Sequence, residues 1–315
     1  MMYCAFCTTS TNPKIVVALD ADEGRHQFRI SFCGRCGSGS LLDSPTDHEL
    51  AHYYEACYYG RGKRKFQSVF QYVFDAGKRR LARSVLVALH DAPNPRVLDM
   101  GCGTGQLLVE LERLGAVPIG FERPGGAARA VRPGLRIIEG EIGEHVHKLD
   151  PVDAVVIWHV LEHLRDPVAV LRASTSLLPS GGLLFLAVPN AASWQARIFG
   201  RYWFHLDIPR HLHFLTADGL RKCLSAEDFI VVREATLQWS QSLFGFVQST
   251  LNLLCPRVPN RLYRLMRDPL TPSRLAELSI WAVAVALLTP FALLEAVFAE
   301  FAGAGAVCMV VAKKA

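Results

Sequence analysis

The sequence has no strong imbalance of charge, no repeated unit and no segment of low complexity. Its net charge of +5, in 315 residues of which 20% are charged, is too small to indicate a nucleic-acid-binding protein by itself. The N-terminal stretch MMYCAFCTTS lacks the basic region and apolar core of a secretory signal, so we expect none. The 50% hydrophobic content indicates a globular chain of one large domain or two smaller ones.

The cysteines do not form the pattern of a disulfide framework. The chain has nine of them, an odd number. Small secreted proteins instead carry an even number of cysteines at dense spacing. We therefore expect a reducing, cytoplasmic compartment. Five cysteines stand alone in the sequence: Cys57, Cys102, Cys223, Cys255 and Cys308.

The other four cysteines form two C-x2-C pairs, YCAFC and FCGRCG, separated by 25 residues. They can supply four thiolates to a tetrahedral Zn²⁺ ion, and KIVVALD and HQFRISF between them predict two short strands. Residues 1–45 are then a zinc-ribbon-like module with a structural metal, since four thiolates leave no open coordination position. The alternative is cysteine pairs without metal, either reduced or redox-active. The predicted ligands are Cys4, Cys7, Cys33 and Cys36.

Residues 46–92 are expected to connect this module to the next domain. A helix is predicted from about Lys65, because apolar residues recur at helical spacing. Residues 61–83 hold eight Lys or Arg against one acid, Asp75. Such a helix either packs on the next domain with a solvated basic face, or meets an anionic membrane or a phosphorylated partner. The apolar residues are Phe66, Val69, Phe70, Val73 and Phe74.

Residues 93–234 alternate apolar strands with helices, which predicts an α/β domain. Near-continuous apolar strands of this kind form a parallel sheet covered by helices on both faces, a doubly wound fold. Ligands of such folds bind at the carboxyl ends of the strands. The predicted strands are 96–100, 117–122, 134–140, 152–158, 181–189 and 228–234, with helices at 104–115, at 166–178 and after an N-cap at Thr216.

The stretch VLDMGCGTG carries the most specific chemical signal. Gly101, Gly103 and Gly105 follow the first strand of this domain, where a tight turn lets backbone approach a ligand and a helix N-terminus can face an anion. A dinucleotide fingerprint would place its third glycine one position later. Asp99 ends the first strand. Glu122 ends the second strand, 23 residues further on, where a carboxylate can accept from both ribose hydroxyls.

These motifs, with GFE, GE, WHVLEHLRDP and LLPSGGLLFLAVPN at the later strands, resemble the class I S-adenosylmethionine-dependent methyltransferases. The N-terminal module with ELAHYYEACY is similar to a bacterial subgroup that carries a zinc-binding region. The resemblance implies S-adenosylmethionine (SAM) as cofactor and a seven-stranded Rossmann-like sheet with an antiparallel last strand. By position, it implies cofactor binding by Asp99, Gly101, Cys102, Gly103, Gly105, Glu122, Glu141, Ile142, Trp158 and His159.

Two groups of polar residues are candidates for the acceptor site. In HVLEH, His163 can act as a base, or it can fix the loop structurally together with Glu162. The segment 200–216, GRYWFHLDIPRHLHFLT, is expected to form an acceptor wall and lid, or else a structural cover. We take His211 as the first candidate for the catalytic base and His163 as the second. The predicted acceptor-binding residues are Tyr202, His205, Arg210 and His213.

A hydrophobic helical insertion, residues 235–303, precedes the expected final strand of the core in 304–315. Within it, residues 278–294 form a run of 17 residues without charge, interrupted by Pro290. A single membrane crossing would place the last strand on the wrong side of the membrane. We therefore expect membrane-surface docking or an apolar acceptor tunnel, or else an ordinary core or dimer interface, in preference to a true span.

These observations predict a SAM-dependent methyltransferase acting on oxygen or carbon of a small-molecule, sugar or lipid-linked acceptor. The chain is expected in the cytoplasm, with a peripheral place at the inner face of the membrane if residues 235–303 contact lipid. One alternative is RNA or DNA methylation through the zinc ribbon and basic helix. Nucleic acid is disfavoured because AVPNAAS lacks the [DN]-P-P-[YF] turn of many base-amine methylases. Another alternative is an inactive cofactor-binding partner protein.

Overall fold

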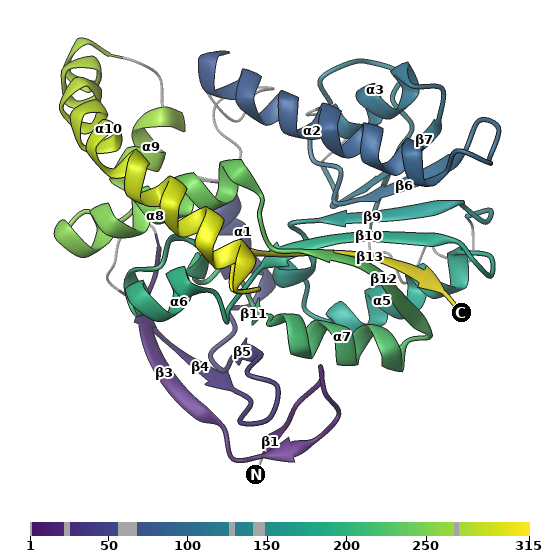
Figure 1. Cartoon of the computed structure of the whole chain (residues 1–315), viewed down its shortest axis with the longest axis horizontal. Helices are drawn as coiled ribbons and strands as arrows, with labels where there is room; N and C mark the ends of the chain where they lie inside the picture. Colours follow the sequence, from purple (N-terminus) through teal and green to yellow (C-terminus); the bar gives the residue numbers. More distant parts are fainter. Residues whose placement is uncertain (1, 22–25, 56–67, 126–129, 141–148, 268–270) are drawn as a thin grey trace.

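The computed structural model describes the chain except residues 1, 22–25, 56–67, 126–129, 141–148 and 268–270 (Figure 1). A seven-stranded sheet runs through the molecule in the order β12-β13-β10-β9-β6-β7-β8. β13 is antiparallel to β10 and β12, whereas the strands from β10 to β8 are parallel. The predicted Rossmann-like sheet is confirmed. Its strands are β6 Arg96–Met100, β7 Val117–Glu122, β8 Ile137–Glu139, β9 Ala154–Trp158, β10 Leu183–Pro189, β12 Phe229–Ala235 and β13 Val307–Lys314.

Two layers of helices cover this sheet, because successive strand residues point to opposite faces. Leu98, Val155 and Ile157 belong to one buried cluster, which includes side chains of α5 and α7. Val97 and Val156 belong to another, which includes side chains of α2 and α3. Figure 1 shows these pairs of helices on opposite sides of the sheet. The helices are α2 Ser68–Ala88, α3 Gln106–Arg113, α5 Pro167–Leu177 and α7 Ala217–Ala226.

The helix starts follow local capping chemistry. Oδ1 of Asp166 accepts from Ala169 N at 2.9 Å and begins α5. Thr216 is the N-cap of α7, as predicted, and its hydroxyl accepts from Gly219 N at 3.1 Å. α3 begins two residues later than predicted, because Gly105 adopts a left-handed conformation before it. The basic residues Arg61, Lys63, Arg64 and Lys65 of the predicted connector helix, and Phe66, lie outside the described residues.

Three N-terminal strands form a second sheet with a strand from the 93–234 domain. Its order is β11-β5-β4-β3, and β11 pairs antiparallel with β5. Ala21 N donates to Ile208 O at 2.7 Å, and Thr216 Oγ1 donates to Cys36 O at 2.6 Å. The cysteine module therefore packs directly on the segment 200–216. The strands of this sheet are β3 Lys14–Leu19, β4 Gln27–Phe32, β5 Gly39–Leu41 and β11 His213–Phe214, and helix α1 Asp47–Glu55 follows β5. β1 Met2–Tyr3 and β2 Ser10–Thr11 pair with each other in a separate two-stranded sheet.

The insertion between β12 and β13 is helical. It consists of α8 Trp239–Leu254, α9 Arg261–Arg267 and α10 Pro272–Phe301, and α10 leads back to β13. By length and composition, α10 could cross a membrane, and 17% of its most apolar window is buried. Both late acids of α10 are held by the protein: Gln195 donates to Glu295 at 2.8 Å, and Thr236 N donates to Glu300 at 2.9 Å. The remaining short helices are α6 Trp194–Phe199, η3 Leu161–His163, η4 Gly200–Tyr202 and η5 Phe204–Leu206.

Candidate functional site

The glycine-rich turn lies between β6 and α3. Gly101, Gly103 and Gly105 have φ values of 71°, 57° and 77°, a region that residues with a Cβ rarely adopt. A Cβ on Gly101 would lie 2.4 Å from Cγ2 of Val160, and one on Gly105 would lie 2.7 Å from Cδ1 of Leu135. A Cβ on Gly103 would meet no atom of the described residues within 4 Å. The turn is thus tightly packed at its ends and open at its centre.

Two buried carboxylates border the turn. Glu122, at the end of β7, accepts from Gly103 N at 2.7 Å and from Arg123 N at 3.1 Å. Asp99 is 2% exposed, and its Oδ2 has no hydrogen-bond partner among the described residues. Burial raises the pKa of Asp99 to about 7, with Lys78 of α2 opposing and Glu122 adding to the rise. A cationic ligand group beside Asp99 would remove this penalty.

The other predicted cofactor residues have different surroundings. Sγ of Cys102 lies 2.7 Å from where a Cβ on Gly120 would be, and burial raises the pKa of its thiol. Trp158 ends β9, and its ring lies edge-on to His159 with centroids 6.2 Å apart. Glu141 and Ile142, the predicted neighbours of adenine, lie outside the described residues.

His159 follows β9 in a backbone conformation that is unusual for a residue with a side chain. Its φ is 57°, in the left-handed region, and such residues concentrate at functional sites. Nε2 of His159 lies 2.8 Å from Oε1 of Gln238, just before α8. The hydrophobic insertion thus contributes a contact at the carboxyl end of β9. The sequence offers no local signal for Gln238, because the contact spans 79 positions.

Glu162 is a buried carboxylate surrounded by histidines. It is 1% exposed, and among the described residues neither of its oxygens has a hydrogen-bond partner. Oε1 lies 3.7 Å from Nδ1 of His159 and 4.0 Å from Nε2 of His211. Burial opposes ionisation of Glu162, but His159, His163 and His211 lower its pKa to about 2. The motif HVLEH predicts that Glu162 fixes the loop together with His163, and the structure places its carboxylate at the centre of this cluster.

The structure brings together the two predicted candidates for the catalytic base. The rings of His163 and His211 are 4.6 Å apart between centroids. Nδ1 of His163 is bonded to Arg210 O at 2.9 Å and to the Tyr54 hydroxyl at 3.1 Å. Burial lowers the pKa of His163 to about 4, with the nearby His211 adding to the effect. Nδ1 of His211 is bonded to a backbone carbonyl, that of His205, at 2.9 Å.

The predicted acceptor-binding residues point in several directions. Arg210 is buried in a bidentate pair with Asp207. His205 is buried, its Nε2 is 3.2 Å from Gln241 O of α8, and burial lowers its pKa to about 4. His213 lies in β11 and bonds to Ser40 of the N-terminal sheet at 3.0 Å. The hydroxyl of the fourth residue, Tyr202, accepts from Arg201 at 2.8 Å.

The four N-terminal cysteines gather at one point. Their Sγ atoms all lie within 4.8 Å of one another. The closest pairs, Cys4 with Cys36 and Cys7 with Cys33, are each 3.7 Å apart. A tetrahedral zinc site with Zn–S bonds of about 2.3 Å has sulfurs about 3.8 Å apart. The cluster could therefore hold a tetrahedral ion with little adjustment.

Comparison with known proteins gives the family. A family model described as a methyltransferase domain matches residues 71–234. The chain belongs to this family. Its glycine turn, its two bordering carboxylates and its strand order are those that the sequence motifs predict for an enzyme that uses SAM, and the chain is a SAM-dependent methyltransferase.

Curated relatives of the methyltransferase are named ubiquinone biosynthesis O-methyltransferase. The protein from Dinoroseobacter shibae is 31% identical over 175 residues, which cover 48% of this chain and 71% of that protein. The protein from Xanthomonas campestris is 32% identical over 133 residues, which cover 38% of this chain and 55% of that protein. A solved SAM-dependent methyltransferase from Archaeoglobus fulgidus superposes with a TM-score of 0.47 at 17% identity, covering 77% of this chain and 99% of that one.

The residues around the glycine turn fit SAM. The unpartnered Oδ2 of buried Asp99 can pair with a cationic amino group, and the open space at Gly103 can admit a ligand. Glu122 is at the position where a carboxylate can accept from ribose hydroxyls. We propose that Asp99 binds the amino group of SAM and that Glu122 binds its ribose. When bound, SAM supplies an electrophilic methyl group.

The pKa of Asp99 predicts how SAM affinity depends on pH. Asp99 must be ionised to pair with the amino group, and its pKa is about 7 in the free protein. Between pH 7.5 and pH 6 its ionised fraction falls about eightfold, while an α-amino group with a pKa of about 7.7–8.0 stays mostly protonated. We expect SAM affinity, measured by calorimetry, to weaken by a similar factor on acidification.

The Asp99→Asn variant is expected to bind SAM weakly with little pH dependence over this range. Glu122→Gln should bind more weakly by about tenfold or more, because a hydrogen bond to a charged group contributes about 1.5–3 kcal/mol, but should retain the pH dependence. Asp150→Asn, which changes an exposed carboxylate, is the matched control and should behave as wild type. Wild-type affinity in Asp99→Asn would refute the assignment of Asp99.

Proposed function

We propose that this methyltransferase transfers the methyl group of SAM to a hydroxyl oxygen of a small, largely apolar acceptor at a membrane surface. The cluster around Glu162 carries this proposal, because a hydroxyl must lose its proton to become a good nucleophile. The cluster is adjacent to the donor site: Val160, two residues before Glu162, packs against Gly101 of the glycine turn. The curated relatives are O-methyltransferases by name, which supports oxygen as the methylated atom.

We propose that His211 activates the hydroxyl by accepting its proton. Because a carbonyl oxygen only accepts, the contact from Nδ1 to His205 O leaves the lone pair on Nε2 when His211 is neutral. Nε2 lies 4.0 Å from Glu162 and 3.9 Å from Asp207. These carboxylates would stabilise an imidazolium formed by proton transfer. His163 and Arg210 then position His211 and Asp207 and do not contact the acceptor.

The exposed side of α10 supports a lipid-facing role. Large apolar side chains recur on it at intervals of three and four residues, which places them on one face of the helix. The late acids of α10 are bonded to the protein, and the early acid Glu277 pairs with Arg261 at 2.5 Å. We call the face formed by the exposed apolar side chains the α10 stripe. Its members are Ile280, Val283, Leu287, Phe291, Leu294, Phe298 and Phe301.

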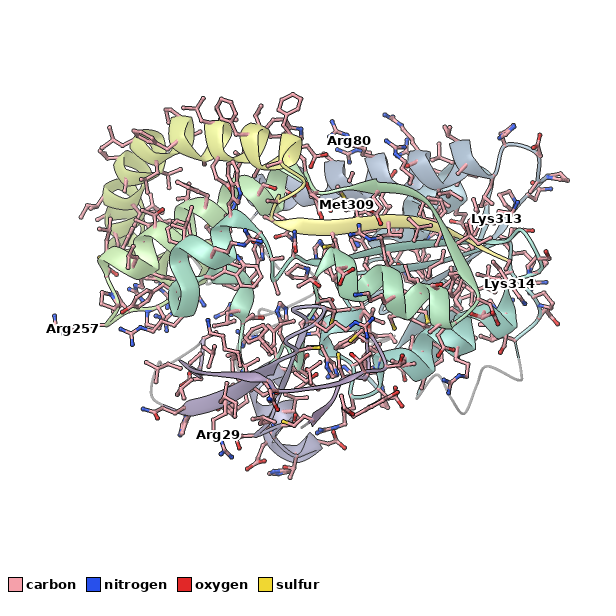
Figure 2. All side chains as sticks on the ribbon, turned by 60° about the horizontal axis from the view of Figure 1, so that its bottom comes forward. Arg29, Arg80, Arg257, Met309, Lys313 and Lys314 are labelled. Atoms are coloured by element: carbon pink, nitrogen blue, oxygen red, sulfur yellow. The ribbon has the colours of Figure 1, made fainter. Side chains whose placement is uncertain are left out.

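Basic residues beside the α10 stripe favour an anionic bilayer as its occupant. α8 packs against both α10 and α2 and so links the two helices. Arg80 and Arg83 of α2 are exposed, and Figure 2 shows Arg80 beyond the C-terminal end of α10 on the upper side. Apolar side chains next to cations are typical of interfacial helices. A symmetric contact between two copies would instead bring these cations together.

The N-terminal cluster supports a further part of the proposal, a structural Zn²⁺ ion held by Cys4, Cys7, Cys33 and Cys36. Four thiolates complete a tetrahedral site, so the ion would stabilise the module and not take part in methyl transfer. Thr216, the last residue of the segment 200–216 and five residues after His211, bonds to Cys36 O. The ion would therefore also stabilise the position of the acceptor-side segment.

The acceptor class can be tested with labelled SAM. The protein is incubated with a cell extract divided into lipid, aqueous small-molecule, glycan and RNA fractions. We expect the label in the lipid fraction, in a product that resists alkaline hydrolysis as an ether does. Label confined to RNA would refute the proposal, and so would label in an ester or on carbon. A variant with Glu122→Gln is the control for cofactor-dependent transfer.

Membrane docking is tested by co-sedimentation with phosphatidylglycerol vesicles. Replacing Ile280, Leu287 and Phe291 together by Asp should abolish vesicle binding, because a charge in the apolar interface is strongly disfavoured. Arg80→Glu with Arg83→Glu should weaken it and remove its salt dependence. Ile15→Asp, on the exposed face of β3, is the matched control. Membrane docking would be refuted if the wild-type protein did not sediment with the vesicles, or if the α10 stripe were buried in a dimer.

The structural zinc predicts a specific effect of Cys33→Ser. This variant should lose one equivalent of bound zinc and melt at a temperature lower by roughly 5 °C or more, since a metal that binds only the folded state stabilises it. Elemental analysis and thermal unfolding measure the two effects. Cys255→Ser, at a lone half-buried cysteine, should change neither. Unchanged zinc content in Cys33→Ser would argue against the four-thiolate site.

A further inference from the structure

A cleft lies between the N-terminal module and the methyltransferase domain. Its volume is about 700 Å³, which is within the range of small-molecule binding sites. Its walls are the second cysteine turn, residues 33–37, the loop before α6 with part of that helix, the first turns of α7, and residues 302–304 after α10. None of the described residues that line it belongs to the glycine turn or to the cluster around Glu162. The cleft is therefore a candidate site separate from the methyl-transfer site.

Two of the charged side chains that line the cleft have no partner of opposite charge. Arg221 and Asp218, both in α7, are each paired with a neighbouring charged residue, at 2.8 Å and 2.6 Å. Arg35, in the second cysteine turn, and Arg197, in α6, are exposed, and neither side chain forms an ion pair or hydrogen bond with the described residues. The cleft thus presents two guanidinium groups whose charge the described part of the protein does not neutralise.

The other groups of the cleft are compatible with an anionic ligand. The first residue of α7, Ala217, is in the wall, and the N-terminal end of a helix carries partial positive charge. Cys33 and Cys36 would bring negative charge as ligands of the proposed zinc ion. However, they are only 8% and 5% exposed, whereas both arginines are exposed. A ligand that enters from solvent therefore meets the guanidinium groups first.

Two arginines on different elements favour a phosphate group over other anions. A guanidinium binds a phosphate through two parallel N–H···O bonds, and the oxygens of a phosphate point in tetrahedral directions, so that one group can bind two arginines at once. A carboxylate has only two oxygens, which lie in one plane. The cleft is also larger than a phosphate ion needs, and the half-buried Trp194 in its wall offers an apolar surface to an organic group. These features fit a phosphate ester.

We propose that Arg35 and Arg197 bind the phosphate group of an ester in this cleft. Because one arginine belongs to the N-terminal module and the other to α6, the ligand would hold the module against the methyltransferase domain. The site is next to the acceptor-side segment, since Thr216 lines it and ends the segment that carries His211. Ligand binding would therefore stabilise the contact on which the position of that segment depends.

The phosphate ester can come from two sources, a soluble compound or the headgroup of a membrane lipid. Residues 302–304 of the cleft follow directly on Phe301, the last residue of the α10 stripe, whose side chain is 86% exposed. A lipid with its headgroup in the cleft would thus begin where the α10 stripe ends. Both sources use the same phosphate chemistry, and the experiments below distinguish them.

Calorimetric titration of the full-length protein with glycerol phosphate tests the site. With ionic strength held constant by chloride, the wild type should bind one equivalent and melt at a higher temperature, because a ligand of the folded state stabilises it. Arg35→Gln and Arg197→Gln should each weaken binding by about tenfold or more, since each removes charge-assisted hydrogen bonds. Arg257→Gln, which removes an exposed arginine at the far left of Figure 2, is the matched control and should bind as wild type.

Co-sedimentation with phosphatidylglycerol vesicles identifies the source. The cleft variant combines Arg35→Gln with Arg197→Gln, and its control combines Arg257→Gln with Arg136→Gln, which removes the same charge from exposed positions outside the cleft. If the ligand is a lipid headgroup, the cleft variant should bind vesicles more weakly than its control. If the ligand is soluble, the two should bind vesicles equally, while only the cleft variant loses glycerol phosphate.

SAM affinity within about twofold of wild type shows that the variants are folded. The proposal would be overturned if the cleft variant bound glycerol phosphate as tightly as the wild type does. It would also be overturned if the wild type bound no glycerol phosphate and the cleft variant bound vesicles as its control does. Neither result depends on the methyl acceptor, so the proposed function is tested separately.

Discussion

The antiparallel pairing of β13 between β10 and β12 is the constraint on which the arrangement of the site depends. Val307, the first residue of β13, pairs with Pro189, the last residue of β10. The insertion therefore leaves from the end of β12 and returns at the same, carboxyl edge of the sheet. That edge also carries the glycine turn and the cluster around Glu162. Chain topology thus explains why Gln238, at the start of the insertion, reaches His159.

The same constraint determines what α10 can do. Because β12 and β13 are neighbours in one sheet, the chain between them must return to the side from which it started. A helix that crossed a bilayer once could not do so, although α10 has the length and composition of a span. Hydrogen bonds from Gln195 to Glu295 and from Thr236 to Glu300 hold its later half against the domain. Its apolar side chains are left at the surface.

Local patterns predicted the elements well. The strands of the large sheet are continuous apolar runs in the sequence. The position of Thr216 as an N-cap follows from capping preferences, and that of Asp99 near the end of β6 follows from the extent of an apolar run. Non-local contacts could not be predicted in this way. His211 and His213 are two residues apart and both polar, yet one faces Glu162 and the other bonds to Ser40 in the N-terminal sheet. This difference arises because β11 pairs with β5, and no local sequence pattern predicts that pairing.

The sequence suggests that the many polar residues of the segment 200–216 bind the acceptor. In the structure, most of them instead contact other parts of the protein. Three bodies meet at this segment: the N-terminal sheet through His213, the insertion through His205, and the Glu162 cluster through His211. Arg210 forms an ion pair with Asp207, so the two charges neutralise each other. Most of the polarity therefore satisfies the protein's own buried groups. Glu162, whose ionised form is favoured by His159, His163 and His211, lies next to the methyl-donor site, and this is where added positive charge would have a large effect on a reacting oxygen.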